Sequence, residues 1–187
     1  MNTKLEKLED EELVVLFVQH QDEKAFSSLY KRYFLSLAKY IGWLTNDRSK
    51  GKDIAQNIFL KIYQSPTLFD TSRRFKTWLF VIAKNQWKNE LRNHSNREKH
   101  KKILAITLGQ KEETTEDNRL KNLSKALEQL TEAHKEVFVL KYSNGLTIKE
   151  IAQILDCSEG TVKSRLFYAL KKTKEFLQNY EKKEVFK

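Results

Sequence analysis

The chain has 187 residues and a formal net charge of +10, from 35 lysines and arginines against 25 aspartates and glutamates. One proline and five glycines argue against an all-β sandwich, and a single cysteine excludes a disulfide framework or a thiolate metal cluster. No apolar run is close to the length of about 18 residues that a membrane span needs, and the first ten residues are too charged for a signal peptide. We therefore expect a cytoplasmic, largely helical protein, and the surplus of positive charge favours nucleic acid as its partner.

Apolar residues recur at helical spacing throughout the first half of the chain. One stripe begins at Leu13, and a second runs from Ala25 to Ile41 and ends where turn residues collect at 45–51. A third helix is expected from Asp53 to Ser65, where the following proline stops it because proline lacks an amide donor. A fourth helix should run from Phe75 to about Arg92.

The composition changes after Leu91. Residues 92–102 are mostly basic and polar and residues 112–117 are acidic, a pattern typical of a linker. Helical periodicity resumes at Leu120. The sequence thus predicts an all-α protein of two small helical domains, residues 1–94 and 121–187, joined by a flexible linker at 95–120, the second domain being a helix-turn-helix.

The second half carries the start and stop signals of two short helices. An apolar helix should end at Asn144-Gly145, and Thr147 with Glu150 three residues later forms a capping box for the next helix. A break at 156–160 then separates this helix from one that begins at Thr161. Two short helices joined by a tight turn are typical of a helix-turn-helix, although a small bundle with a solvated basic face remains an alternative.

The second helix of this pair is expected to read duplex DNA. Its outward side chains include cations, a hydroxyl and aromatic rings, which can contact phosphates, guanine edges and thymine methyls. The expected set is Thr161, Lys163, Ser164, Arg165, Phe167, Tyr168, Lys171 and Lys172.

The helix from Phe75 carries a different pattern. Trp78, Asn85, Asn89 and Arg92 share one stripe, flanked by Lys84 and Lys88. Such a stripe suits unstacked single-stranded DNA, because rings stack on bases, amides bind base edges and cations hold the backbone. An aromatic at helical spacing is also an ordinary core residue, so the tryptophan alone does not decide between the two.

Four segments together resemble one family. The run 74–85 (RFKTWLFVIAKN), with 25–33 and 53–63, looks like region 2 of the extracytoplasmic-function (ECF) sigma factors, the small two-domain members of the sigma-70 family. Residues 130–170 are similar to region 4 of that family, notably at 145–152 and 160–166.

The resemblance implies a non-enzymatic RNA polymerase sigma factor without metal or cofactor. Region 2 would open and read the −10 promoter element, region 4 would read the −35 element, and both would bind core polymerase, at the clamp coiled coil of its largest subunit and at the flap. An anti-sigma factor or another recruiting protein is a further candidate partner. The implied −10 set is Arg73, Arg74, Lys76, Trp78, Lys84, Asn85, Lys88, Asn89 and Arg92, and the implied polymerase-binding set is Asp53, Gln56, Asn57 and Leu60.

Two of the chain's departures from the family pattern bear on its partners. Lys50, Lys52 and Asn57 stand where carboxylates are common in the polymerase-docking helix, and Tyr168 and Leu170 replace arginines of the reading helix. These departures raise the hypothesis that another protein assists recruitment. Two other functional classes stay open: a stand-alone helix-turn-helix regulator that binds only duplex DNA, and a sigma-like adaptor that has lost promoter reading.

Overall fold

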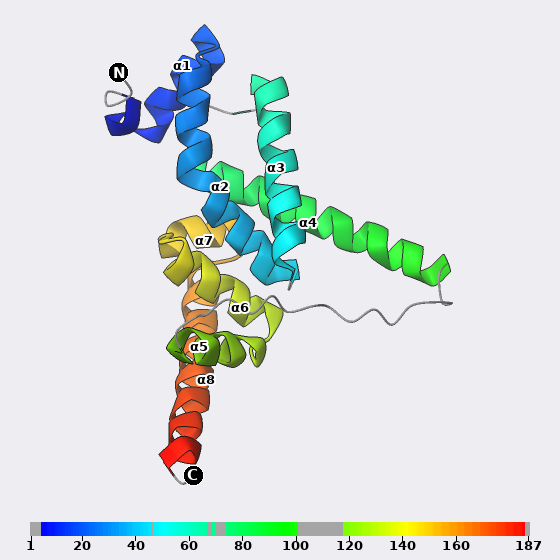
Figure 1. The fold of residues 1–187 in the computed structure, drawn as a ribbon, viewed down its shortest axis with the longest axis vertical. Coiled ribbons are helices and arrows are strands. Elements are labelled where there is room, and N and C mark those ends of the chain that lie inside the picture. The colour runs from blue at the N-terminus through cyan, green and yellow to red at the C-terminus, as the bar shows by residue number, and fades with distance from the viewer. Residues whose placement is uncertain (1–4, 46, 67–68, 70–73, 101–117, 186–187) are drawn as a thin grey trace.

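The computed structural model describes residues 5–45, 47–66, 69, 74–100 and 118–185. Every regular element in these ranges is helical, which confirms the all-α prediction. The elements are η1 (Leu5–Lys7), α1 (Asp10–His20), α2 (Glu23–Thr45), α3 (Arg48–Gln64), α4 (Phe75–His100), α5 (Asn118–Glu128), α6 (Glu132–Phe138), the π-helical turn η3 (Val139–Ser143), α7 (Ile148–Leu155) and α8 (Glu159–Val185). Figure 1 shows α1–α4 as one body and α5–α8 as a second, with the far end of α4 projecting from the first. No described helix is long and apolar enough to cross a membrane.

A charged cluster fixes α1 against α2. The Arg32 guanidinium donates to the Asp10 carboxylate at 2.8 Å, and its other nitrogen donates to the carbonyls of Glu6 and Leu8, each at 2.8 Å. The Tyr33 hydroxyl donates to the same Asp10 side chain. The two nitrogens of this guanidinium thus join α2 both to the first residue of α1 and to the carbonyls of the segment before it. These bonds set the angle at which that segment meets α2.

The helix α3 begins five residues earlier than the spacing of apolar residues predicted, at Arg48 instead of Asp53. The Asp47 carboxylate caps it by accepting from the Lys50 amide at 3.0 Å. Gly51, which the sequence suggested as part of a turn, lies inside α3 and is buried where α3 meets α2. A glycine is needed there because a Cβ would lie 2.5 Å from the Ala38 carbonyl oxygen.

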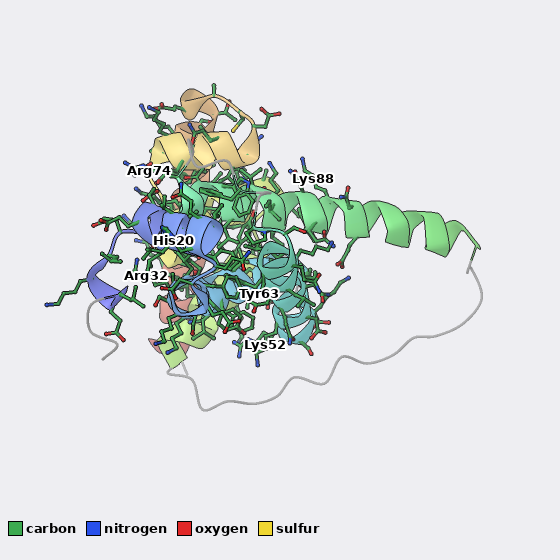
Figure 2. The ribbon with its side chains drawn as sticks, turned by 90° about the horizontal axis from the view of Figure 1, so that it is seen from above. His20, Arg32, Lys52, Tyr63, Arg74 and Lys88 are labelled. Carbon is green, nitrogen blue, oxygen red and sulfur yellow. The ribbon has the colours of Figure 1, made fainter. Side chains whose placement is uncertain are left out.

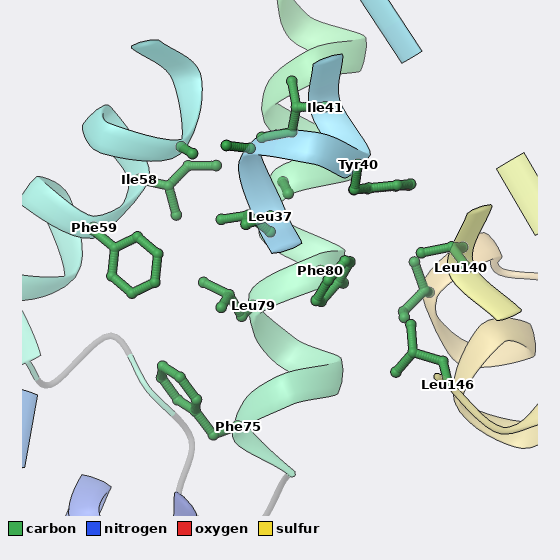
Figure 3. Close-up of a cluster of buried hydrophobic side chains, with 14 of the residues drawn as sticks. Leu37, Tyr40, Ile41, Ile58, Phe59, Phe75, Leu79, Phe80, Leu140 and Leu146 are labelled. Atoms are coloured by element: carbon green, nitrogen blue, oxygen red, sulfur yellow. The ribbon is translucent and has the colours of Figure 1, made fainter. Parts of the chain in front are cut away.

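The helix α4 is the part of the first body that packs against both its own helices and the second body. In Figure 3, Phe75 and Leu79 face the side chains of α2 and α3, whereas Phe80 faces Leu140 and Leu146 of the second body. The buried side chains of both bodies form one continuous apolar cluster. The helix extends to His100, beyond the expected end near Arg92, and no glycine or proline interrupts this stretch.

The helix-turn-helix has the predicted local geometry. Gly145 adopts a left-handed conformation with φ +64° after η3, and Thr147 with Glu150 forms the complete capping box of α7. The helix α8 begins at Glu159, two residues before the expected Thr161, because the Ser158 hydroxyl accepts from the Thr161 amide at 3.1 Å. The serine cap, and not the threonine, therefore sets the first turn of α8.

Candidate nucleic-acid interface

One stripe of α4 is open to solvent. Asn85, Lys88 and Asn89 are exposed, and the labelled Lys88 side chain extends away from the helices in Figure 2. They occupy the side of the helix opposite the buried Leu79 and Ala83. Two amides and a cation thus share one exposed side of α4, as the helical spacing of these residues predicted.

Trp78 borders this stripe. Its ring meets Phe69 edge to face at a centroid distance of 4.9 Å, and Phe75 at 5.9 Å, so the indole is half-buried and locked in orientation. One part of the ring belongs to the core and the remainder stays accessible. The structure is thus compatible with both expectations for this tryptophan, because one edge of the ring packs in the core while the rest stays accessible.

Between the exposed stripe and the buried side of α4, a further row of side chains faces the second body. The Lys76 ammonium donates to the Asn144 carbonyl at 2.7 Å, and the Lys84 ammonium donates to the Ile154 carbonyl at 3.1 Å. Phe80, which is fully buried, lies between them on the same stripe. Lys84 is only 5% exposed, and burial lowers the pKa of its ammonium. Of the basic residues expected at the −10 site, these two are engaged by the helix-turn-helix.

Arg74 also reaches the second body. Its guanidinium lies 3.5 Å from the Glu150 carboxylate of the α7 capping box, with 77% of the arginine side chain exposed; Figure 2 shows Arg74 beside α7. Burial alone would raise the pKa of Glu150, but the hydrogen bonds from Thr147 and the nearby Arg74 together lower it. Arg73 and the side chain of Arg92 lie outside the described part of the chain.

Most of the residues that were expected to contact duplex DNA are exposed on α8. Thr161 and Arg165 are half-buried, and Phe167 and Tyr168 are 62% and 50% exposed, with ring centroids 5.5 Å apart. The other expected residues, all exposed, are Lys163, Ser164, Lys171 and Lys172. Aromatic rings and cations are thus side by side on the exposed surface of α8.

His134 of α6 lies beside the cations of α8. Its ring lies 6.1 Å from that of Tyr168. Burial lowers the pKa of the imidazole, and Lys172 and Arg165 of α8 lower it further. Lys172 and Arg165 of α8 therefore lie close to His134, where α6 meets α8.

A separate surface lies on α3. Asp53, Gln56, Asn57 and Leu60 are all exposed on one face of the helix, and Leu60 is 51% exposed. The adjoining Lys52 and Lys61 are exposed as well. Of the four residues on this face only Asp53 is acidic, so the neighbouring lysines offset its negative charge. The Lys50 ammonium lies 3.7 Å from the Glu90 carboxylate of α4.

Several side chains between the bodies carried no recognisable signal in the sequence. The Tyr40 hydroxyl donates to the Glu136 carboxylate at 2.8 Å, and the Lys135 ammonium lies 5.4 Å above the Trp43 ring. Each pair joins α2 to α6 across more than ninety residues of chain, as the 96-residue separation of Tyr40 and Glu136 illustrates. Within the described residues, no group of three or more histidines, cysteines or carboxylates is placed to hold a metal ion.

An amide-bearing helix with a fixed tryptophan, joined to a helix-turn-helix with a basic aromatic face, defines a two-part DNA-binding protein. Comparison with known families agrees: Sigma-70 region 2 matches residues 29–97 and Sigma-70 region 4 matches residues 120–173. The chain is 35% identical to the ECF RNA polymerase sigma-E factor of Haemophilus influenzae, over 93% of this chain and 96% of that protein. It is 32% identical to the ECF RNA polymerase sigma factor SigL of Mycobacterium tuberculosis, over 81% and 88% of the two chains.

Two solved structures share the fold. One is the sigma factor RpoE in complex with the anti-sigma factor NepR from Bartonella quintana, with a TM-score of 0.70, 22% identity, and coverage of 83% of this chain and 98% of that chain. The other is CnrH in complex with the cytosolic domain of CnrY, with a TM-score of 0.67, 23% identity, and coverage of 91% and 97%. The chain belongs to the ECF family of RNA polymerase sigma factors, which are non-enzymatic initiation factors acting with core polymerase on promoter DNA.

Proposed function

We propose that α4 captures the −10 element as single-stranded DNA and that α8 reads the −35 element as duplex. The exposed stripe of Asn85, Lys88 and Asn89 beside the oriented Trp78 carries this proposal. Amides can bind the edge of an extruded base, the indole can stack on it, and the lysine can hold the adjacent phosphate. The protein would act on the chromosome in the cytoplasm.

Capture of an extruded base gives the protein a role in strand opening. Unstacking and unpairing cost a few kcal/mol per base, so a preformed pocket offsets part of that cost only after the base has left the helix. A helix serves this purpose better than a loop, because its backbone is already ordered and loses little entropy on binding. The stripe on α4 therefore favours the open state of the promoter over the duplex.

The α8 face is suited to intact duplex. Lys163, Ser164 and Arg165 lie in the first turns of α8, where a recognition helix normally presents residues to base edges. Phe167 is exposed enough to contact a thymine methyl, and the lysines at 171 and 172 continue the line towards the phosphates. Two readers in one chain raise the effective concentration of each at a correctly spaced promoter.

The exposed face of α3 is the proposed polymerase contact. Leu60 supplies an apolar centre, and Asp53, Gln56 and Asn57 supply a polar border. Because Lys52 adds positive charge, a matched polymerase or a helper protein would strengthen this contact. Comparing promoter-complex yield with purified core polymerase and with cell extract tests the helper, and equal yields would remove the need for one.

Run-off transcription with core polymerase and a library of promoter fragments is the direct test of the whole proposal. The variant N85A/N89A should lose about tenfold or more of its transcripts, because each base contact contributes about 1–3 kcal/mol. It should retain binding to the duplex −35 element. N179A, which removes an exposed asparagine of α8, is the control and should transcribe normally.

The alternative classes give different results in the same assay. A duplex-only regulator would be indifferent to N85A/N89A, and an adaptor would be indifferent to K163A/R165A. The exposed Lys174 of α8 provides the matched control K174A for the second pair. Full activity of either double variant would overturn the corresponding half of the proposal.

A further inference from the structure

Tyr63 continues the exposed face of α3 beyond Leu60. It lies three residues after Leu60 and seven after Gln56, a spacing that places all three on one side of the helix. Its side chain is 42% exposed. Lys61 lies two residues before Tyr63 and therefore points to a different side of α3. The carboxyl end of this face thus presents an aromatic ring.

Neighbouring rings hold Tyr63 in place. Its ring centroid lies 6.1 Å from that of Phe17 of α1, with the planes inclined by 20°, and 5.1 Å from that of Phe26 of α2. Phe26 in turn meets Phe59, which is buried in α3, at 6.2 Å. Three helices thus fix the tyrosine, so that its side chain loses little entropy when a partner binds the part that is accessible.

A carboxylate from another helix lies at the hydroxyl end of this ring. The Tyr63 hydroxyl donates to Glu23 Oε1 at 2.8 Å, and this hydrogen bond raises the pKa of the phenol, so the tyrosine stays the donor. Glu23 is exposed and is the first residue of α2. The preceding Asp22 has a different role, because its carboxylate accepts from the amides of Lys24 and Ala25 at the start of α2. Glu23 is thus the acidic residue at this end of α2 that reaches α3.

This contact changes where the negative charge of the α3 face lies. Of the four residues expected to contact polymerase only Asp53 is acidic, and Asn57 stands where a carboxylate is common in the family. Glu23 adds a negative charge beside Tyr63, which is about 9 Å further along the helix axis than Asn57 at about 1.5 Å per residue. A carboxylate beside an accessible ring suits a cation, because the carboxylate pairs with its charge and the ring can add a cation–π contact.

We propose that Glu23 binds a cationic side chain of core polymerase and that the Tyr63 hydroxyl positions its carboxylate. The inference rests on the proposed docking of α3 and extends that surface to α2. Charge complementarity identifies the occupant, because this carboxylate would repel the phosphates of promoter DNA and attract a basic protein surface. A polymerase whose cation lies opposite the Tyr63 end of α3, and not opposite Asn57, is then the matched polymerase for this chain.

Competition binding to purified core polymerase tests the proposal with the full chain. Each unlabelled variant displaces a fluorescent wild-type chain, and the displacement curve gives its dissociation constant. E23Q removes the charge but keeps an oxygen that can accept from Tyr63, and it should bind about tenfold more weakly, as the loss of a charged hydrogen bond implies. Its affinity should also fall less steeply with salt than that of the wild type. E11Q, which removes a charge from an exposed residue in the first turn of α1, is the control and should bind normally.

Y63F tests the positioning role of the hydroxyl. It should weaken binding about threefold, because the Glu23 carboxylate keeps its charge but loses its fixed orientation. The double variant E23Q/Y63F should bind no more weakly than E23Q, because the hydroxyl acts only through the carboxylate. Additive losses in the double variant would overturn the positioning role. Circular dichroism should show wild-type helix content in every variant.

L60A separates the cation site from the docking surface on which it rests. L35A, which truncates a leucine of α2 that is 63% exposed, is its control. If L60A weakens binding and E23Q matches the wild type, the cation site is wrong and the α3 face stands. If both variants match the wild type, the docking of α3 has failed together with the cation site. Equal weakening by E23Q and E11Q would also overturn the cation site, because the effect would then come from overall charge.

Discussion

Gly51 shows how a single residue determines the distance between two helices. An added Cβ would lie 2.5 Å from the Ala38 carbonyl oxygen, and 2.6 and 2.7 Å from the amide nitrogen and Cα of Gly42. All three are backbone atoms, which cannot rotate away as the end of a side chain can. The α2–α3 pair packs against α4 and carries the proposed polymerase face, so this contact holds the amino-terminal body together.

We expect G51A to destabilise the protein by about 1–3 kcal/mol or more, as overpacking of a tight core does. G160A is the control: its Cβ would meet only the Ser158 hydroxyl oxygen at 3.7 Å, an ordinary contact, in the first turn of α8. Alanine there should be neutral or stabilising by up to about 1 kcal/mol. Urea unfolding of the three proteins provides the comparison, and a G51A protein as stable as the wild type would contradict the proposed close packing.

At the scale of the element, α7 depends on its cap. The helix has only eight residues, from Ile148 to Leu155, so its own hydrogen bonds contribute little net stability. The Thr147 hydroxyl accepts from the Glu150 amide at 3.2 Å, while the Glu150 carboxylate accepts from the Thr147 amide at 2.8 Å. The same carboxylate lies near Arg74, so the cap also links α7 to the residue that precedes α4.

T147A should therefore cost about 1 kcal/mol of the free energy of unfolding, because the first turn of α7 loses its side-chain acceptor. T147S, which retains the hydroxyl, should stay within a few tenths of a kcal/mol of the wild type. Chemical unfolding followed by circular dichroism measures both. A T147S protein as unstable as T147A would mean that the threonine methyl group, and not the cap, matters here.

At the scale of the whole molecule, Glu136 makes the contact between the two bodies sensitive to pH. Burial raises the pKa of this carboxyl, even though the Tyr40 hydroxyl of α2, Lys84 and Lys88 of α4, and Arg165 of α8 all lower it. A raised pKa means that the folded protein binds the proton more tightly than the unfolded chain. Glu136 therefore contributes stability that is complete below the ordinary glutamate pKa and is lost as pH rises through the raised value.

The variant E136Q isolates this effect. Glu150 has a lowered pKa and so acts in the opposite direction, but it is present in both proteins and its contribution cancels in their difference. The stability of the wild type relative to E136Q should fall as pH rises from about 4.5 to 7, above the ordinary glutamate pKa of about 4.3. Thermal unfolding across this range measures the difference, and a relative stability that rises with pH would show that the cations outweigh burial.

Much of this structure could be predicted from residues close together in the sequence. The Thr147–Glu150 capping box, the glycine that ends η3 and the exposed α8 face each depend on residues within a few positions of one another, and the sequence predicted all three. The expected starts of α3 and α8 were wrong by a few residues, because Asp47 and Ser158 are caps that compete with neighbouring polar residues equally able to begin a helix. The end of α4 was misplaced for a related reason, since charged residues serve both linkers and helices.

The sequence alone determined that the protein is helical, that it carries an amide stripe and a helix-turn-helix, and that it resembles an ECF sigma factor. These features could be predicted because helical periodicity and caps depend on residues within a few positions of one another. Only the tertiary structure decided which lysines of α4 are open and which are engaged. Lys84 and Lys88 are the same residue type one turn apart, yet Lys84 meets the Ile154 carbonyl 70 residues away while Lys88 faces solvent. Their difference arises from the packing of segments remote in sequence, which no local pattern encodes.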